Sequence, residues 1–372
     1  MCQSVSYSVK HYHTAPAQLT VTLFLPNILW VHLSQVTQDS VHLYSWLRVA
    51  IFLQVVTMGD HNPARVAMLV LSLLIYVIVL AFNGMAGPGI GPFVQTTKNV
   101  SDIYDTEITP SGWTFSIWGI IYTWLTAMLL YIFTGLCRRN AYGWVYCSPA
   151  VLPYGFFVSW LINMTLNIIW LILWDRELMI PALVVLALVA FTNYLMVFFS
   201  CHGLHVYGAW LNKYHRVDLW CLRVLVQNGI CVYTTWTSIA TLINFNIVLS
   251  YEAGVSKSDG GTVCLAILLT EVITWFVLEN FVVEKHVRYI LTIYPVVIMA
   301  LAGNMTKNYD SAAPSRNGIL IAVLLALVCT LFLVRVALVI WRHLKQPLYR
   351  GEASKGAMSP MEIAEKQKKM FT

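Results

Sequence analysis

Residues 66–87 read VAMLVLSLLIYVIVLAFNGMAG, a continuous apolar run without a single charged side chain. A helix rises about 1.5 Å per residue, so roughly 20 such residues cross the ~30 Å hydrocarbon core of a bilayer. The apolar residues do not alternate with polar ones, as they would in a strand of a membrane β-barrel. The stretch therefore predicts a transmembrane helix.

The composition extends this prediction to the whole chain. Of the 372 residues, 58% are hydrophobic and 11% are charged, whereas a soluble domain is about 45–50% apolar and about 25% charged. A water-soluble fold could not bury this much apolar surface, so we expect an all-α integral membrane protein. Similar apolar runs predict about eight transmembrane helices, at residues 66–87, 112–135, 152–174, 180–200, 222–248, 263–283, 287–303 and 318–341.

The predicted spans divide the chain into four parts. Residues 1–57 are apolar but interrupted, and we expect them to form an atypical, poorly ordered extension. Met58 is an alternative natural start, and the sequence leaves this question open. Residues 58–248 hold five spans, residues 249–341 hold three more, and residues 342–372 form a basic tail.

The basic residues indicate the orientation of the spans. Lysine and arginine gather in alternate gaps and in the tail, and such residues stay on the cytosolic side. Those in the gaps are Arg138, Arg139, Lys213, Arg216, Arg223, Lys285 and Arg288. We therefore expect both termini in the cytosol, and a plasma membrane or endomembrane location rather than the mitochondrial outer membrane. The net charge of +6 lies mostly in the tail, which predicts contact with membrane lipids and no nucleic-acid partner.

Two glycosylation sequons agree with this orientation. Asn99 and Asn304 lie in gaps predicted to face outside, and an N-linked glycan needs an Asn-x-Ser/Thr sequence on that side. A third sequon, at Asn163, lies inside a predicted span. We therefore expect glycans at Asn99 and Asn304.

Amide and aromatic side chains follow one face of three predicted spans. In the third span, Asn163, Asn167 and Trp170 stand four and three residues apart, which places them on a single helix face. Similar stripes are formed by Trp118 and Tyr122 in the second span and by Tyr233, Trp236 and Asn244 in the fifth.

Each stripe alone has an ordinary explanation. Tryptophan and tyrosine favour membrane interfaces, and asparagine can join neighbouring helices. Three stripes together favour a shared cavity with aromatic walls and a few hydrogen-bonding groups, as small-molecule sites have. The sequence presents no nucleophile with its base and no metal cluster, so we expect neither an enzyme nor a cofactor.

The three stripes resemble the signatures of the TspO/translocator protein family, also known as peripheral benzodiazepine receptors or tryptophan-rich sensory proteins. The matching residues are Pro110, Trp113, Trp118 and Tyr122, then Leu166, Asn167 and Trp170, then Tyr233, Trp236 and Asn244. The resemblance covers about residues 66–248. It implies a five-helix bundle, here followed by three added C-terminal helices. It also implies a pocket below the loop joining the first two helices, which accepts porphyrins, sterols and synthetic apolar ligands.

On this resemblance we expect a protein that binds or translocates a hydrophobic planar ligand, either a tetrapyrrole or a lipid such as a sterol. Slow porphyrin breakdown, proposed for some relatives, stays open, as does a homodimer. One alternative is a proton-coupled secondary transporter that uses Glu271. Another is a membrane scaffold or regulator without a transported ligand.

The last three spans carry charged residues at membrane depth, where a charge costs at least about 2.5 kcal/mol. Glu279 and Arg335 lie at similar depths in the sixth and eighth spans, so we expect a structural ion pair. Glu271 lies near the middle of the sixth span, and a coupling role and a structural role are both open. His202 and His205 could bind a metal if helical, but no third ligand completes a site, so none is expected.

Overall fold

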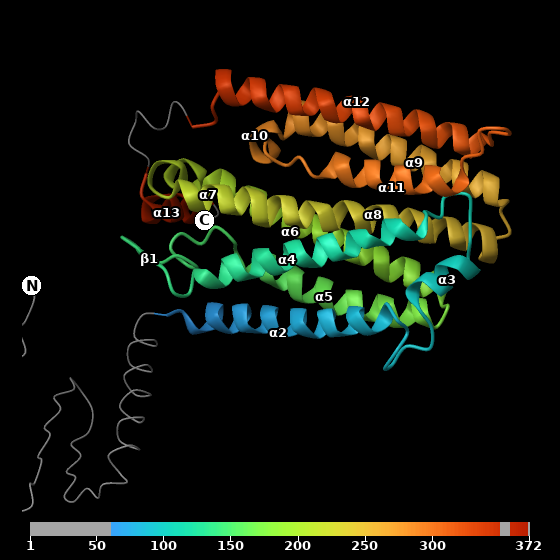
Figure 1. Ribbon diagram of the computed structural model, residues 1–372. Helices are drawn as coiled ribbons and strands as arrows, with labels where there is room; N and C mark the ends of the chain where they lie inside the picture. Colours follow the sequence, from blue (N-terminus) through green and yellow to red (C-terminus); the bar gives the residue numbers. More distant parts are fainter. Residues whose placement is uncertain (1–60, 350–357, 371–372) are drawn as a thin grey trace, which may run out of the picture. The chain divides into compact units, whose positions relative to one another are not determined.

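The computed structural model describes residues 61–349 and 358–370, so the predicted extension at 1–57 lies outside the described part. Long helices dominate it (Figure 1). They are α2 (Pro63–Ala86), α4 (Ile117–Thr134), α5 (Tyr154–Asp175), α6 (Met179–Tyr214), α8 (Gly229–Ile247), α9 (Lys257–Val277), α11 (Ile293–Asn308) and α12 (Arg316–Lys345). The shorter elements are α3 (Thr97–Ile103), η1 (Gly112–Ser116), β1 (Arg139–Asn140), β2 (Gly143–Trp144), α7 (Arg216–Cys221), η2 (Leu222–Asn228), η3 (Val248–Glu252), η4 (Leu278–Val282), α10 (Glu284–Val287) and α13 (Pro360–Met370).

Six of the eight predicted spans correspond to helices that are long and apolar enough to cross a membrane. They are Pro63–Ala86, Gly112–Thr134, Tyr154–Asp175, Met179–Tyr214, Lys257–Val282 and Arg316–Lys345. The prediction of a helical integral membrane protein is therefore confirmed. The predicted number of eight spans is not established by these six helices. In the described residues, strand structure is limited to the two-residue strands β1 and β2, which pair as an antiparallel hairpin.

The other two predicted spans, 222–248 and 287–303, correspond to α8 and α11. Helix α8 carries a run of threonines and two asparagines, Asn244 and Asn246, and most of its residues are buried. It packs against α4, α6, α9 and α11. A helix surrounded by other helices can carry more polar side chains, because those side chains find partners in protein rather than lipid. Helix α11 has only 16 residues.

Several predicted boundaries differ from the structure by five residues or more; α9, for example, begins at Lys257 and not at residue 263. Helix α6 does not end at residue 200 but continues to Tyr214, because Leu204, Tyr207 and Leu211 keep an inward face at helical spacing and are buried. Helix α11 begins at Ile293 rather than at residue 287. Proline is tolerated only in the first turn of a helix, so Pro295 fixes this start.

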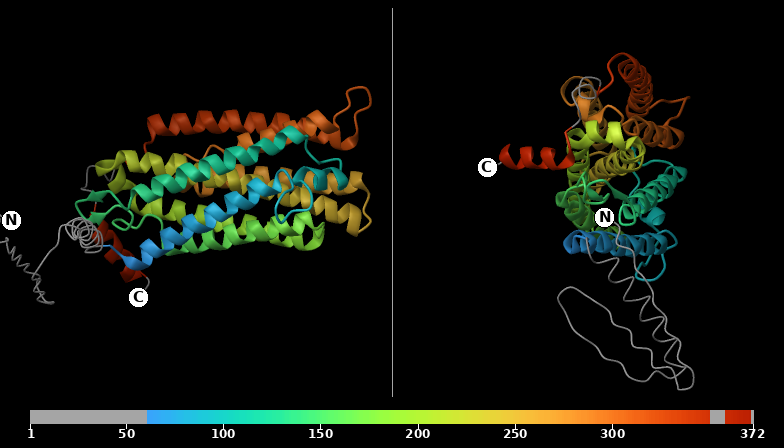
Figure 2. Two further views of the ribbon diagram at one scale, coloured as in Figure 1. Left: turned by 60° about the horizontal axis from the view of Figure 1, so that its bottom comes forward. Right: turned by 90° about the vertical axis from the view of Figure 1, so that its left-hand side faces the viewer.

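The helices of residues 62–372 form a continuous series of packed neighbours. Helix α2 packs on α5, α5 on α6 and α6 on α8, while α9 and α11 join α8 to α12. Figures 1 and 2 show α2 and α12 on opposite sides of α8. The C-terminal helices therefore pack on the preceding ones and share a hydrophobic core with them.

The elements α7, α10 and the β1–β2 hairpin lie toward one end of the helices (Figure 1), and many basic residues belong to these elements or to the adjoining helix ends. We call this the basic end; its residues are Arg65, Arg138, Arg139, Lys213, Arg216, Arg223, Lys285, Arg288, Arg342 and Lys345. The opposite end carries α3 and the turn between α11 and α12. The charge alternation read from the sequence thus corresponds to two physical ends of the structure.

Candidate functional site

Aromatic rings from three helices meet around Trp118, in the first turn of α4. Its ring centroid lies 5.8 Å from that of Tyr122, 6.4 Å from Trp170 on α5, 6.4 Å from Tyr233 and 6.2 Å from Trp236 on α8. These separations are those of interacting aromatic pairs. Side chains distant in sequence therefore form one group, which we call the aromatic cluster.

Amide groups join the aromatic cluster to a fourth helix. The Asn167 side-chain NH₂ donates to the hydroxyl of Tyr233 at 3.1 Å, and its carbonyl oxygen accepts from the amide of Asn83, on α2, at 2.9 Å. Asn167 is 3% exposed. Its two hydrogen bonds hold α2, α5 and α8 together at this level.

Several polar atoms of the predicted stripes are buried without a hydrogen-bond partner among the described residues. They include the Tyr122 hydroxyl and the indole N–H groups of Trp170 and Trp236 in the aromatic cluster. Both side-chain polar atoms of Asn244 are also unpartnered, eight residues or about 12 Å beyond Trp236 along α8. Leaving a buried donor or acceptor unpaired costs about 1–3 kcal/mol. Each of these groups therefore keeps an unused hydrogen-bonding capacity in the structure.

Two of the residues singled out in the sequence, Trp113 of the family signature and Asn163 of the third-span stripe, lie outside the aromatic cluster. Trp113 is 48% exposed, and its indole N–H donates to the hydroxyl of Thr306 on α11 at 3.2 Å. Asn163 turns toward α6, where its NH₂ lies 2.9 Å from the carbonyl of Val189 and 3.0 Å from the amide oxygen of Asn193. Both residues are therefore packing contacts outside the aromatic cluster.

Two residues of this region, Asn83 and Trp174, could not be recognised as members from the sequence. Asn83 stood as a single amide near the end of the first apolar run, and that was its only signal. Trp174 follows Trp170 by one helical turn and stacks on it at 5.5 Å. Its indole N–H donates to the carbonyl of Thr97 at 3.2 Å, so the loop between α2 and α4 covers this end of α5.

Asp175 fixes the same loop at the end of α5. Its carboxylate accepts from the backbone N–H of Val94 at 2.9 Å and of Gln95 at 3.1 Å. The neighbouring Glu177 accepts from the Gln95 side chain at 2.7 Å. The loop is thus held over the side of the aromatic cluster that faces away from the basic end.

A family model described as TSPO-like protein matches residues 68–339. This match covers well over half of the chain. The chain belongs to the TSPO-like protein family. No curated protein and no solved structure matches it. The family match extends well past the predicted resemblance at 66–248, through α9 and α11 and into α12, where the sequence offered no recognisable signature.

In this TSPO-like protein, Glu271 lies on α9 near the middle of the span Lys257–Val282 and is exposed. It lines two adjoining hollows, of about 110 and 590 Å³, together with Tyr194 of α6 and Trp275 of α9. Tyr194 and Ser238 share a hydrogen bond of 2.7 Å at the same place. Among the described residues, Glu271 has neither an ion-pair nor a hydrogen-bond partner, which sets it apart from Glu279.

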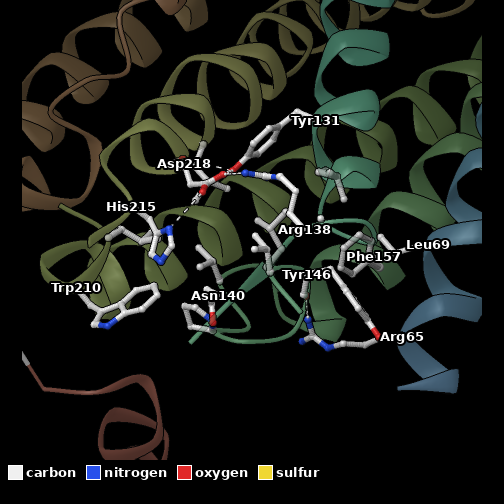
Figure 3. A pocket seen from close by; sticks show the side chains of 18 residues that line it. Arg65, Leu69, Tyr131, Arg138, Asn140, Tyr146, Phe157, Trp210, His215 and Asp218 are labelled. Atoms are coloured by element: carbon white, nitrogen blue, oxygen red, sulfur yellow. Dashed lines mark hydrogen bonds and ion pairs between the residues drawn. The ribbon is translucent and has the colours of Figure 1, made fainter. Parts of the chain in front are cut away.

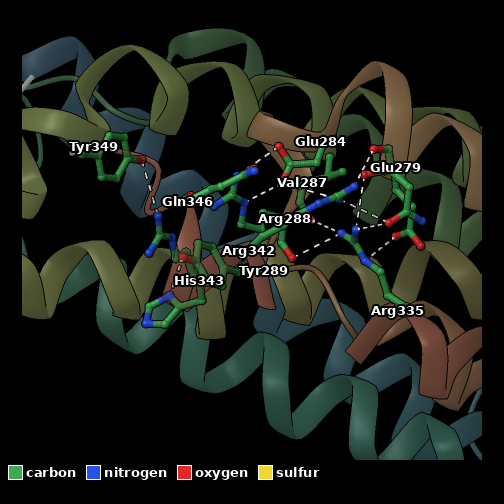
Figure 4. A network of polar contacts seen from close by, with 12 residues as sticks. Glu279, Glu284, Val287, Arg288, Tyr289, Arg335, Arg342, His343, Gln346 and Tyr349 are labelled. Carbon is green, nitrogen blue, oxygen red and sulfur yellow. Dashed lines mark hydrogen bonds and ion pairs between the residues drawn. The ribbon is translucent and has the colours of Figure 1, made fainter. Parts of the chain in front are cut away.

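Glu279 and Arg335 form the expected ion pair. Their nearest side-chain atoms, Oε2 and Nε, lie 3.2 Å apart, and both side chains are 0% exposed. Figure 4 shows this pair as part of a polar network that continues to Glu284, Arg288 and Arg342. The network joins η4, α10 and α12, so its position indicates a structural role.

The two predicted glycosylation sites differ in access. Asn304 lies within α11, is 6% exposed, and donates from its amide to the carbonyl of Ile108 at 2.9 Å. A glycan cannot be attached to an amide nitrogen that is buried and engaged in this way, so the expectation for Asn304 is wrong. Asn99 is exposed on α3, and a glycan there stays a prediction.

Proposed function

We propose that this TSPO-like protein binds or translocates a flat, hydrophobic ligand, a tetrapyrrole or a lipid such as a sterol, at the aromatic cluster. The observation that supports this most is the combination of converging rings with buried, unpartnered polar atoms on Trp170, Trp236 and Asn244. The rings offer flat apolar faces for stacking. The indole and amide groups offer hydrogen bonds to a polar edge of the ligand, which would fix its orientation.

The proposal includes the arrangement in the membrane. Helices α8 and α11 would cross it beside the six longer spans, giving eight, because they lie alongside α6 and α12 within one packed series. The basic end would face the cytosol, as the preference of lysine and arginine for that side implies. Asn99 would then face outside.

Asn244→Leu tests the binding site. We expect the affinity for protoporphyrin IX to fall about tenfold, which corresponds to one lost hydrogen bond of about 1.4 kcal/mol. We also expect the free energy of unfolding not to fall, because the variant removes polar atoms that have no partner in the protein. Fluorescence titration and unfolding of the purified protein in detergent measure the two quantities.

Asn163→Leu is the matched control, since Asn163 is equally buried but bonded to α6. It should lower stability by about 1–3 kcal/mol and leave porphyrin affinity unchanged. If Asn244→Leu lowers stability and keeps full affinity, the residue is structural and the proposed site loses its main support.

A second candidate function is proton-coupled transport, which the unpartnered carboxyl group of Glu271 supports. An acidic side chain at membrane depth without a cationic partner is unfavourable, and such residues often serve ion or proton movement. The transported ligand would then move with a proton carried by Glu271.

Glu271→Gln keeps the shape and most of the hydrogen-bonding capacity of the side chain but removes its charge. We expect it to fold normally and to abolish the dependence of ligand uptake on a pH gradient in proteoliposomes. Glu252→Gln, at an exposed position beyond α8, is the control and should keep that dependence. An unchanged pH profile in the Glu271 variant would rule out the coupled mechanism.

A further inference from the structure

A separate cavity lies at the basic end, where the start of α2 meets the ends of α4 and α6, the loop that contains the hairpin, and α7 (Figure 3). Its volume is about 60 Å³, several times the ~15 Å³ that one water molecule needs on the same measure. Trp118 and this cavity lie at different levels of α4. Tyr131, which lines the cavity, is 13 residues or about 20 Å further along the helix.

The cavity has an apolar floor. Leu69 of α2, Phe157 of α5 and Leu222 at the start of η2 are all buried and line it, together with Ile132 and Leu152. Leu69 lies one turn further into α2 than Arg65, and Leu222 follows Asp218 by one turn, so both lie further from the basic end than these charged residues. A hydrocarbon chain entering the cavity would therefore meet apolar walls.

Arg65 provides an unbalanced positive charge in the cavity wall. It is only 8% exposed, donates to the carbonyl of Tyr146 at 2.9 Å, and lies 4.9 Å from the ring of Tyr154. No carboxylate of the described residues pairs with it. It also lies in the first turn of α2, where the helix dipole adds further positive potential.

The other charges in the cavity wall balance one another. Arg138 contacts the carboxylate of Asp218 at 2.6 Å, and the hydroxyl of Tyr131 donates to the same carboxylate at 3.0 Å. Partial burial lowers the pKa of Arg138, but the interactions of its guanidinium with Asp218 and with Tyr131 outweigh burial and leave the pKa above its ordinary value. His215 lies 3.9 Å from the other oxygen of Asp218. Asp218, the one acidic residue among the described residues that line the cavity, is therefore already paired with Arg138, Tyr131 and His215. It does not compensate the charge of Arg65.

We propose that this cavity binds an amphiphile with one anionic headgroup, a carboxylate or a phosphate, and a hydrocarbon chain. The guanidinium of Arg65 would hold the headgroup, since arginine pairs with both kinds of oxyanion. The chain would follow Leu69 and Phe157 into the bilayer. The location fits such a ligand, because lipid headgroups lie at the level where the basic side chains gather. This site is separate from the aromatic cluster and goes beyond the proposed function.

The test measures binding to the purified full-length protein in an uncharged detergent. The probes are dodecanoate, a lysophosphatidate of the same chain length, dodecanol and dodecylammonium. We expect at least one of the two anions to bind saturably, and the alcohol and the ammonium to bind at least about tenfold more weakly. Preference for dodecanoate identifies a fatty acid as the source, and preference for the lysophosphatidate identifies a phospholipid.

Arg65→Gln should weaken binding of the preferred anion about tenfold, while Arg65→Lys should retain most of it. Arg216→Gln removes an exposed charge at the same end and should have no effect. Leu69→Phe fills the cavity while keeping Arg65 and should also weaken binding, so it decides the matter if Arg65→Gln does not fold. Equal binding of dodecanol, or full affinity in both Arg65→Gln and Leu69→Phe, would overturn the proposal. Porphyrin affinity should be unchanged in these variants, which separates this site from the aromatic cluster.

Discussion

Replacing Arg335 with methionine is expected to lower the free energy of unfolding by about 3–5 kcal/mol. Arg335 and Glu279 are both 0% exposed. The variant removes the cation and leaves the Glu279 carboxylate buried, with the Tyr294 hydroxyl as its remaining donor. An isolated buried charge is among the most unfavourable arrangements in a protein interior.

The hydrogen bonds of the guanidinium add to this effect. Arg335 donates to the side-chain oxygen of Asn280 at 3.0 Å and to the backbone carbonyls of Val287 at 3.1 Å and Arg288 at 3.2 Å. Figure 4 shows these contacts converging on one side chain. Arg335 thus connects α12 to the turn that contains α10, and its loss leaves several acceptors without a donor.

The measurement is unfolding of the purified protein in mixed micelles, with two comparisons. Arg316→Met breaks an ion pair with Asp259 in which both side chains are largely exposed, and we expect little change. Glu279→Met combined with Arg335→Met removes both charges, and we expect it to be considerably more stable than Arg335→Met alone. If the double variant is as unstable as the single one, packing and not the buried charge governs this site.

This ion pair is also a case in which sequence alone was sufficient. Two opposite charges at similar depth in neighbouring apolar runs have few other ways to avoid lipid, so their pairing could be predicted. The aromatic stripes could be predicted for a similar reason, because helical spacing fixes which side chains share a face. It does not fix which neighbour that face meets, and Asn163 consequently turned out to contact α6 instead of the aromatic cluster.

The remaining features depend on contacts between distant segments. The cavity at the basic end takes its polar lining, such as Arg65, Arg138 and Asp218, from separate elements, and none of these segments carries a motif. The sequence also does not show that the side-chain amide of Asn244 lacks a hydrogen-bond partner, because this depends on the residues that surround it in the fold. Likewise, the polar composition of α8 did not indicate that most of its residues are buried. Its threonines and asparagines face other helices, and this is known only from the structure.

Gly203→Ala is expected to lower the free energy of unfolding by about 3 kcal/mol, at the upper end of what overpacking costs. In an ordinary helix this substitution is favourable by about 1 kcal/mol, since alanine has the higher helix propensity. At Gly203, however, an added Cβ would lie 1.8 Å from the carbonyl oxygen of Val151. That oxygen belongs to the backbone just before α5, so relief requires α6 and the start of α5 to separate.

Gly119→Ala is the matched control, because Gly119 lies in α4 and an added Cβ there meets nothing within 4 Å. We expect it to leave stability unchanged or to raise it by up to about 1 kcal/mol. The two alanine variants should therefore change unfolding in opposite directions in the same assay. If Gly203→Ala is as stable as the parent protein, α6 does not approach the carbonyl of Val151 this closely. The packing of α6 over the start of α5, which also places Trp210 and Leu211 beside the cavity at the basic end, would then need revision.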